Sequence, residues 1–260
     1  LDANRLLPTY SLDTGLIYER DASYFGRQLR QTLEPRAFFV RTPYKDQSLL
    51  PSYDSGVTDF NLTTIYAENP YVGQDRIADT NLVTLGVNSR FFDANNGAEL
   101  ARFGFAQRYR FSDQMVRLPG ELPVASGFSD ILLGAGVRWD RRWSVDSTLQ
   151  FDAQTHRTTR TTLTTRFNPT PYRVFNTAYR LSRDQSEQID VGWQWPLRDF
   201  SFAADKPSAD APYLTPGQGL GADRWYSVGR MNFSLKDRKM VDTLLGFEYD
   251  AGCWLGRVVY

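Results

Sequence analysis

The chain has 260 residues, of which 41% are hydrophobic, and its 30 basic and 30 acidic residues leave a formal net charge of zero. That balance gives no reason to expect a nucleic-acid partner or a basic membrane-surface protein. No run of about 18 apolar residues occurs, so the sequence offers no transmembrane helix, and it shows no initiator methionine, signal peptide or lipidation signal.

Apolar and polar residues alternate along most of the chain, which is the pattern of a half-buried β-strand. In residues 143–154 the odd positions are mostly apolar and the even positions are polar. A helix would need apolar spacings of three and four, which fail here. The alternation predicts about twelve strands, near residues 9–21, 28–42, 80–93, 99–112, 130–140, 143–155, 158–167, 171–183, 186–196, 224–235, 239–249 and 253–260.

The length of these strands favours a membrane barrel. Globular strands average roughly five or six residues, whereas a tilted strand that crosses a bilayer needs about nine to eleven. In a barrel the apolar face meets lipid, the polar face lines a wet lumen, and aromatic residues gather at the strand ends. We therefore predict an all-β, antiparallel transmembrane β-barrel. A soluble β-sandwich, whose polar face would meet bulk water, is the alternative.

Short links near residues 140–143, 167–171 and 250–253 alternate with longer ones at 43–79 and 113–129. This parity fits tight periplasmic turns and long outer loops. Residues 197–223 depart from it, because they form a long link on the short-turn side. They are either an inserted periplasmic loop or a sign that the strand count slips by one.

The link 43–79 is long enough to be either functional or disordered. We expect it to be extracellular or packed in the lumen, because it contains several residues suited to packing: Tyr53, Phe60, Ile65, Tyr66 and Tyr71.

No catalytic constellation emerges from the sequence. The only histidine, His156, lies in a turn rich in threonine and arginine, and no phosphate-binding or nucleophile-elbow motif occurs. A solvated turn residue is the simplest interpretation of His156. We therefore expect neither an enzyme nor a metal or cofactor site.

The segment QTLEPR, residues 31–36, is unusual because a proline inside a strand removes a ladder donor. Pro35 shares the lipid-side parity, whereas Glu34 and Arg36 take the lumenal parity. Two interpretations stay open here: an irregular strand with a lumenal ion pair, or an interruption of the sheet that shapes the wall.

Seven collinear pieces resemble the LptD family of outer-membrane lipopolysaccharide-assembly proteins. They run almost from end to end and keep the order and spacing of the family: IYER (17–20), QTLEPR (31–36), PYKDQS (43–48), YDS (53–55), GQDRIAD (73–79), TLGVNSRFFD (84–93) and FEYDAGCW (247–254).

The resemblance implies a barrel of about 26 strands, of which this chain would supply the middle and later part. A periplasmic jelly-roll domain, the first and last strands and the lateral gate between them would lie outside it. The implied function is non-enzymatic insertion of lipopolysaccharide into the outer leaflet of a Gram-negative outer membrane. The implied partners are an LptE-like lipoprotein plug and a periplasmic LptA-like bridge. A general or oligosaccharide-specific porin is the alternative function.

The resemblance also marks individual residues. In the family, two adjacent cysteines follow a turn and form disulfides to the jelly-roll region; here the first position is Gly252 and the second is the only cysteine, Cys253. One disulfide from Cys253 to a partner outside the chain is therefore expected. The matching motifs suggest further lumenal or structural residues: Glu34, Pro35, Arg36, Tyr44, Asp46, Gln47, Asp54, Asp75 and Arg76.

Overall fold

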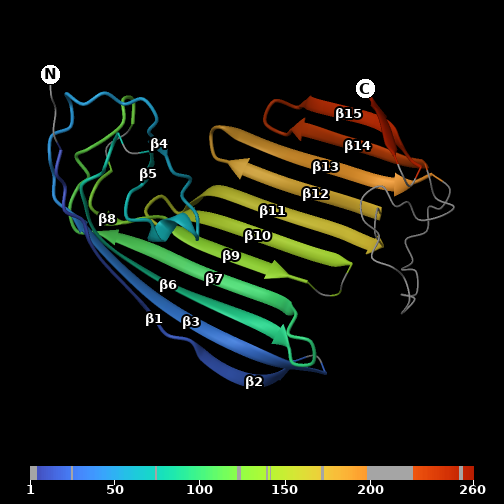
Figure 1. The fold of residues 1–260 in the computed structure, drawn as a ribbon, viewed down its shortest axis with the longest axis horizontal. Helices are drawn as coiled ribbons and strands as arrows, with labels where there is room; N and C mark the ends of the chain where they lie inside the picture. The colour runs from blue at the N-terminus through green and yellow to red at the C-terminus, as the bar shows by residue number, and fades with distance from the viewer. Residues whose placement is uncertain are drawn as a thin grey trace. The chain divides into compact units, whose positions relative to one another are not determined.

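The computed structural model describes residues 5–24, 26–73, 75–121, 124–138, 140, 142–170, 173–197, 225–251 and 254–260. Within them the protein is all-β apart from one short 3₁₀ helix, η1 (Thr64–Tyr66). Figure 1 shows the strands in their order along the chain. Their bounds are β1 (Tyr10–Gly15), β2 (Tyr18–Tyr24), β3 (Arg27–Thr42), β4 (Gly56–Val57), β5 (Tyr71–Val72), β6 (Thr80–Asp93), β7 (Glu99–Arg110), β8 (Gly127–Phe128), β9 (Ile131–Val137), β10 (Trp143–Asp152), β11 (Arg157–Thr170), β12 (Arg173–Ser182), β13 (Ser186–Pro196), β14 (Trp225–Ser234), β15 (Lys239–Asp250) and β16 (Leu255–Val259).

Fourteen of the described strands belong to one sheet, whose order is β1-β3-β6-β7-β9-β10-β11-β12-β13-β14-β15-β16. Strand β2 pairs with β3 and β8 pairs with β7 beside that path, and β4 and β5 form a separate two-stranded sheet. Successive neighbours pair antiparallel wherever their register is described. The predicted all-β antiparallel fold is confirmed, and the sheet is that of a partial β-barrel.

Each predicted strand is present to within a few residues, with one difference. The region predicted as a single strand at 9–21 is two strands, β1 and β2, which both pair with β3. The break lies opposite Pro35, whose carbonyl accepts a hydrogen bond from the Leu16 amide at 3.1 Å. The return bond cannot form because proline has no N–H. Strand β3 itself continues past Pro35, which stays in register with Val87 of β6.

The chain divides into two compact units, Leu1–Ala135 with Leu149–Thr158, and Gly136–Thr148 with Thr159–Tyr260. In the first unit, one face of the sheet exposes large apolar residues, among them Leu33, Phe39, Leu85, Phe103 and Phe105. On the opposite face the neighbouring positions are covered: Phe38, Val40, Thr84 and Arg108 are all at most 4% exposed.

In the second unit the two faces differ in polarity. The outward face exposes apolar side chains: Leu163, Phe175, Ile189, Met231, Leu245 and Phe247. The inward face carries hydrogen-bonded polar residues, including Asp190 with Arg230 and Glu248 with Gln194 and Arg257. This polarity is the alternation read from the sequence.

Aromatic rings lie along one end of the strands of the second unit. Phe167 contacts Trp143 at 4.4 Å and Trp195 at 6.3 Å between ring centroids. Tyr249 contacts Trp225 at 4.9 Å and Trp254 at 5.5 Å. In outer-membrane barrels the aromatic girdles also lie at the strand ends. In the part of the chain that the structure describes, no helix is long and apolar enough to cross a membrane.

Candidate functional site: a segment docked on the polar face of the sheet

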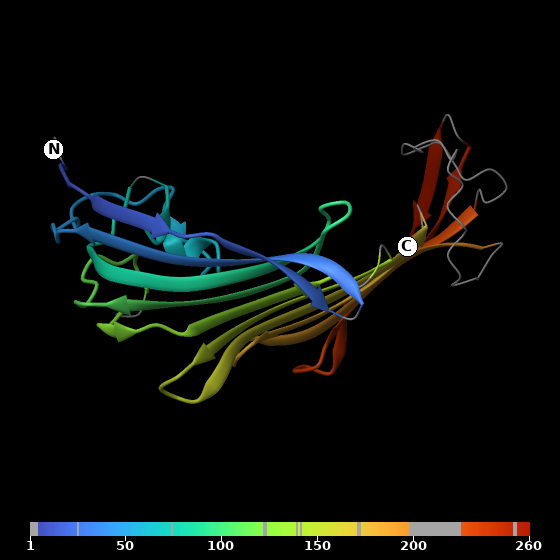
Figure 2. The ribbon, with the colours of Figure 1, turned by 90° about the horizontal axis from the view of Figure 1, so that it is seen from below.

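Residues 43–79, here called the covering segment, include the two-stranded sheet of β4 and β5 and, between these strands, η1. Figures 1 and 2 show that they lie over one face of the first unit, above β3, β6 and β7. Their sequence folds locally around Asn61, whose side-chain oxygen accepts hydrogen bonds from the amides of Thr63 at 2.9 Å and Thr64 at 3.1 Å. Such Asx turns favour a short helical turn over an extended chain. The turn thereby presents Ile65 and Tyr66 to the sheet.

Ile65 is the central anchor of the covering segment. Its side chain is 0% exposed and packs with Ala106 of β7 and Leu132 of β9. Its carbonyl oxygen accepts hydrogen bonds from the Thr84 hydroxyl at 3.2 Å and from Nη2 of Arg108. Apolar burial and two directed hydrogen bonds therefore act on the same residue, which fixes both the position and the orientation of η1.

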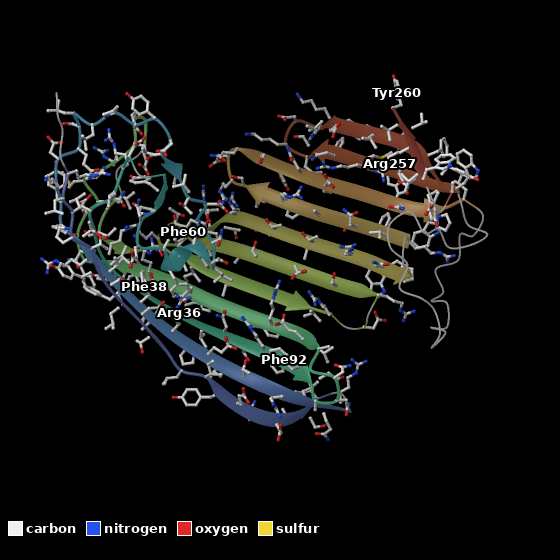
Figure 3. The ribbon with its side chains drawn as sticks, viewed as in Figure 1. Arg36, Phe38, Phe60, Phe92, Arg257 and Tyr260 are labelled. Atoms are coloured by element: carbon white, nitrogen blue, oxygen red, sulfur yellow. The ribbon has the colours of Figure 1, made fainter. Side chains whose placement is uncertain are left out.

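Tyr66 occupies a slot that depends on a glycine. A Cβ at Gly86 of β6 would lie 1.9 Å from the Tyr66 hydroxyl oxygen and 2.9 Å from the Phe105 carbonyl oxygen, so no larger residue fits without a shift. The Tyr66 ring contacts Phe38 edge-to-face at 6.4 Å between centroids. Figure 3 shows Phe38 and Arg36 on β3, with Phe60 of the covering segment near η1.

Arg36 links the tyrosine to the edge of the sheet. Its guanidinium carbon lies 4.2 Å from the centroid of the Tyr66 ring, which is a cation–π contact. Its Nε donates to Asp13 Oδ1 of β1 at 2.9 Å. Glu34, two residues earlier, accepts from Thr32 at 2.8 Å and lies 3.8 Å from Nε of Arg90. Arg36 and Glu34 thus have separate charged partners and do not pair with each other.

Arg108 is a buried cation beneath the covering segment. It is 4% exposed, and no carboxylate among the described residues forms an ion pair with it. Besides the Ile65 carbonyl, its donors reach the Thr84 hydroxyl at 3.3 Å, and its guanidinium lies 5.8 Å from the Phe60 ring centroid. Burying a charge is costly unless hydrogen bonds compensate it. The docked segment supplies that compensation, so the position of η1 and the burial of Arg108 depend on each other.

Hydrogen bonds also join the early part of the covering segment, near Gln47, to its late part, near Asp75; this set of contacts is here called the junction. Gln47, which is 4% exposed, accepts from Arg5 Nη1 at 2.7 Å and donates to the Ile77 carbonyl at 2.7 Å. Asp75 accepts from the amides of Tyr53 at 2.5 Å and Asp54 at 2.9 Å. These backbone donors, that of Asp54 first, lower the pKa of the Asp75 carboxyl.

Arg76 belongs to the same junction. It is 7% exposed, and its Nη2 donates to the Leu50 carbonyl at 2.8 Å, while its amide donates to the Ser55 hydroxyl at 3.1 Å. Through its side chain and its backbone amide, Arg76 therefore holds together stretches of the covering segment that lie more than twenty residues apart in the sequence.

The covering segment is also joined to the link between β7 and β9. The Tyr71 hydroxyl lies 2.6 Å from Oε2 of Glu121 and accepts a hydrogen bond from Nε2 of the Gln114 side chain at 2.9 Å. Burial, followed by the hydrogen bond to Glu121, raises the pKa of Tyr71. Asp79 accepts from the Val116 amide at 2.7 Å. The two long links are therefore connected through buried polar groups.

The sequence-selected residues fall into different places. Gln47, Asp54, Asp75 and Arg76 meet in the junction of the covering segment, whereas Glu34, Pro35 and Arg36 lie on β3. Tyr44 and Asp46 join neither group: Tyr44 is 56% exposed, and Asp46 accepts from the Ser48 amide at 2.9 Å, which is the first cause of its lowered pKa. Cys253, Gly252 and nearly all of the predicted loop 197–223 lie outside the described residues.

Sequence reasoning did not single out the residues that receive η1. Gly86 lies inside one of the matching motifs, and Arg108 lies within the strand predicted at 99–112, but neither was selected. A glycine in a strand interior signals a close approach of another chain, and this signal could have identified Gly86.

Within the described residues, no group of three or more metal-ligating side chains is placed to hold a metal ion. The contacts instead hold a folded segment against a sheet. The covering segment is held against the sheet by buried apolar side chains, directed hydrogen bonds and a cation–π contact.

A sheet of long antiparallel strands, apolar on one face and polar on the other, defines the class of outer-membrane-type β-barrel walls. The particular family follows from comparison with known proteins. The family model for LptD, the LPS transport system D, matches residues 2–209, and the chain belongs to that family.

Three relatives named LPS-assembly protein LptD match nearly the whole chain. The one from Paracidovorax citrulli is 59% identical over 257 residues, covering 99% of this chain and 31% of the relative. The one from Albidiferax ferrireducens is 54% identical over 258 residues, covering 99% and 32%. The one from Thiobacillus denitrificans is 36% identical over 256 residues, covering 98% and 32%. The chain thus spans about a third of the length of these relatives.

Proposed function

We propose that the protein assembles lipopolysaccharide into the outer leaflet of a Gram-negative outer membrane, and that this chain forms part of its barrel wall. The observation that carries the proposal is the match over nearly the whole chain to relatives named as LPS-assembly proteins. The long strands support it, because their apolar face suits lipid. The role is non-enzymatic: the barrel guides a molecule and makes or breaks no bond in it.

The polar face of the sheet suits the sugar part of a glycolipid but not its acyl chains. Arginine, aspartate, glutamate and glutamine side chains can hydrogen-bond the sugar part of a glycolipid or a plug protein. Acyl chains cannot favourably enter such a polar lumen, so they need a separate apolar route. We therefore place the sugar part at the inward face and infer an LptE-like lipoprotein as a lumenal partner. A domain outside this chain would receive lipopolysaccharide from an LptA-like periplasmic bridge.

The covering segment would then lie on the lumenal side of the wall. Docked through Ile65 and Tyr66, it narrows the space that a sugar chain can use beside β3, β6 and β7. We also infer that Cys253 forms a disulfide to a cysteine outside this chain. Non-reducing and reducing gels of the full-length protein test this bond, and identical mobility on the two gels would contradict it.

Conditional depletion of the full-length protein tests the function. Newly made lipopolysaccharide should fall at the cell surface and accumulate inside, and an LptE-like lipoprotein should co-purify with the protein. Unchanged surface lipopolysaccharide together with no such lipoprotein would refute the proposal. A porin would instead lose solute permeability on depletion, while lipopolysaccharide stayed normal.

A further inference from the structure

Positive charge is concentrated at the turn between β14 and β15, although the formal net charge of the whole chain is zero. Lys236, Arg238 and Lys239 lie within four residues and are all exposed. The intervening carboxylate, Asp237, is directed back to β14, where it lies 3.0 Å from the Ser234 hydroxyl, and its own amide donates to that hydroxyl at 3.0 Å. The turn and the first residue of β15 therefore leave three exposed cations at this end of the strands.

These cations have no carboxylate partner among the described residues, since none of the ion pairs found there includes them. Two arginines on the inward face of the same unit do have carboxylate partners: Arg230 pairs with Asp190 at 2.7 Å, and Arg257, labelled in Figure 3, pairs with Glu248. Internal charge pairing thus accounts for these inward arginines and leaves the cations of the turn unexplained.

The turn is also held in place. Nζ of Lys236 donates to the carbonyl of Asp184 at 2.7 Å and to that of Gln185 at 3.0 Å, both in the neighbouring turn between β12 and β13. Two hairpin tips are thereby tied together. The charge of Lys236 has a defined position on the rim, and Arg238 and Lys239 extend from the same turn.

An apolar belt begins directly below these cations. Met240 and Val241 are 48% and 52% exposed, and Phe247 near the other end of β15 is 54% exposed. The belt ends at the aromatic cluster around Tyr249. For a strand tilted by about 40°, residues 240–249 span roughly 23 Å along the membrane normal, close to the roughly 25 Å apolar band of outer-membrane barrels. The cations therefore stand where lipid headgroups would begin.

Lysines on an exposed turn often serve only solubility, but a soluble turn does not require an apolar belt beneath it. We propose that the β14–β15 turn binds the phosphate headgroups of anionic lipid in the leaflet that it meets. A guanidinium can chelate a phosphate through two hydrogen bonds, and the ammonium groups add point charges. This inference rests on the proposed function only in requiring that the strands cross a membrane with phosphorylated lipid.

The test uses the full-length protein in nanodiscs with a photo-crosslinking amino acid at Met240. The discs contain phosphatidylcholine with either bisphosphorylated lipid A or the same lipid without phosphate. The test variant is Arg238→Gln/Lys239→Gln. The control is Arg138→Gln, which removes an exposed cation of the same unit at the other end of the strands, directly after β9.

We expect cross-linking to bisphosphorylated lipid A to exceed that to the dephosphorylated lipid. It should fall roughly 25-fold in the test variant, since each of the two basic residues removed contributes about a fivefold gain in binding near an anionic surface. The control variant should cross-link normally. Equal labelling of both lipids, or an equal loss in both variants, would overturn the inference. Binding in nanodiscs is measured without transport, so normal cross-linking alongside unchanged lipopolysaccharide on depletion would refute the proposed function alone.

Discussion

At the scale of single residues, the fit between Tyr66 and Gly86 sets the position of η1. Gly86→Ala should displace the tyrosine and cost about 1–3 kcal/mol locally, the usual cost of overpacking. Hydrogen exchange of residues 64–67 in the full-length protein should accelerate. Adding Tyr66→Phe, which removes one of the two clashing atoms, should restore part of the protection.

Gly56→Ala is the matched control for this change, because its new Cβ would meet only Val72 at 3.5 Å, an ordinary contact. Protection at 64–67 should stay unchanged in that variant. Equal exchange in Gly86→Ala and the unaltered protein would show that Tyr66 does not occupy the slot.

Arg108 provides the second prediction at this scale. Arg108→Met would remove the cationic donor of the Ile65 carbonyl and leave it only the hydrogen bond from Thr84. Losing a hydrogen bond to a charged group costs about 1.5–3 kcal/mol. Limited proteolysis should cleave the covering segment faster, whereas the heat-modifiable gel mobility of the folded barrel should persist. Arg102→Met is the control, since Arg102 is exposed on the same face of β7 and its 3.9 Å ion pair with Glu99 contributes little. Cleavage at the rate of the unaltered protein in Arg108→Met would contradict this role.

At the scale of elements, the junction of the covering segment should respond to pH. The pKa of Asp75 is lowered in the folded state by the amides of Asp54 and Tyr53. Its contribution to stability is therefore complete above its unfolded pKa of about 3.9 and is lost as pH falls through the lower folded value. A fluorophore attached at residue 52 should report opening in acid. Asp75→Asn should show that opening already at neutral pH.

The control for this prediction is Asp46→Asn, because Asp46 lies outside the junction and only caps a local turn. The fluorophore should respond to acid in that variant as in the unaltered protein. An identical pH response in Asp75→Asn and the unaltered protein would rule out Asp75 as the group responsible.

The elements themselves were largely predictable, because period-two alternation is a local property of the chain. The strand predicted at 186–196 matches β13, Ser186–Pro196. The break between β1 and β2 was not predictable in the same way, since it depends on Pro35 in the opposing strand. The docking of η1 could not be predicted from local sequence patterns either, because Gly86, Arg108 and Ile65 are far apart in the sequence and meet only in the folded protein.

At the scale of the whole molecule, the proposed function requires the sheet to be a wall between lipid and a wet interior. Positions one residue apart along a strand should then meet different surroundings. Three adjacent strands of the second unit supply matched pairs: Leu163 with Thr162, Phe175 with Asn176, and Ile189 with Gln188, where the first of each pair faces outward.

The most direct test of this claim introduces single cysteines at these six positions in the full-length protein in isolated outer membranes. Labelling by a water-soluble maleimide and quenching of attached fluorophores by lipid-borne nitroxides are then compared. The account predicts maleimide labelling at 162, 176 and 188, and lipid quenching at 163, 175 and 189. Equal labelling of both sets without lipid quenching would contradict a membrane wall and favour a soluble sheet.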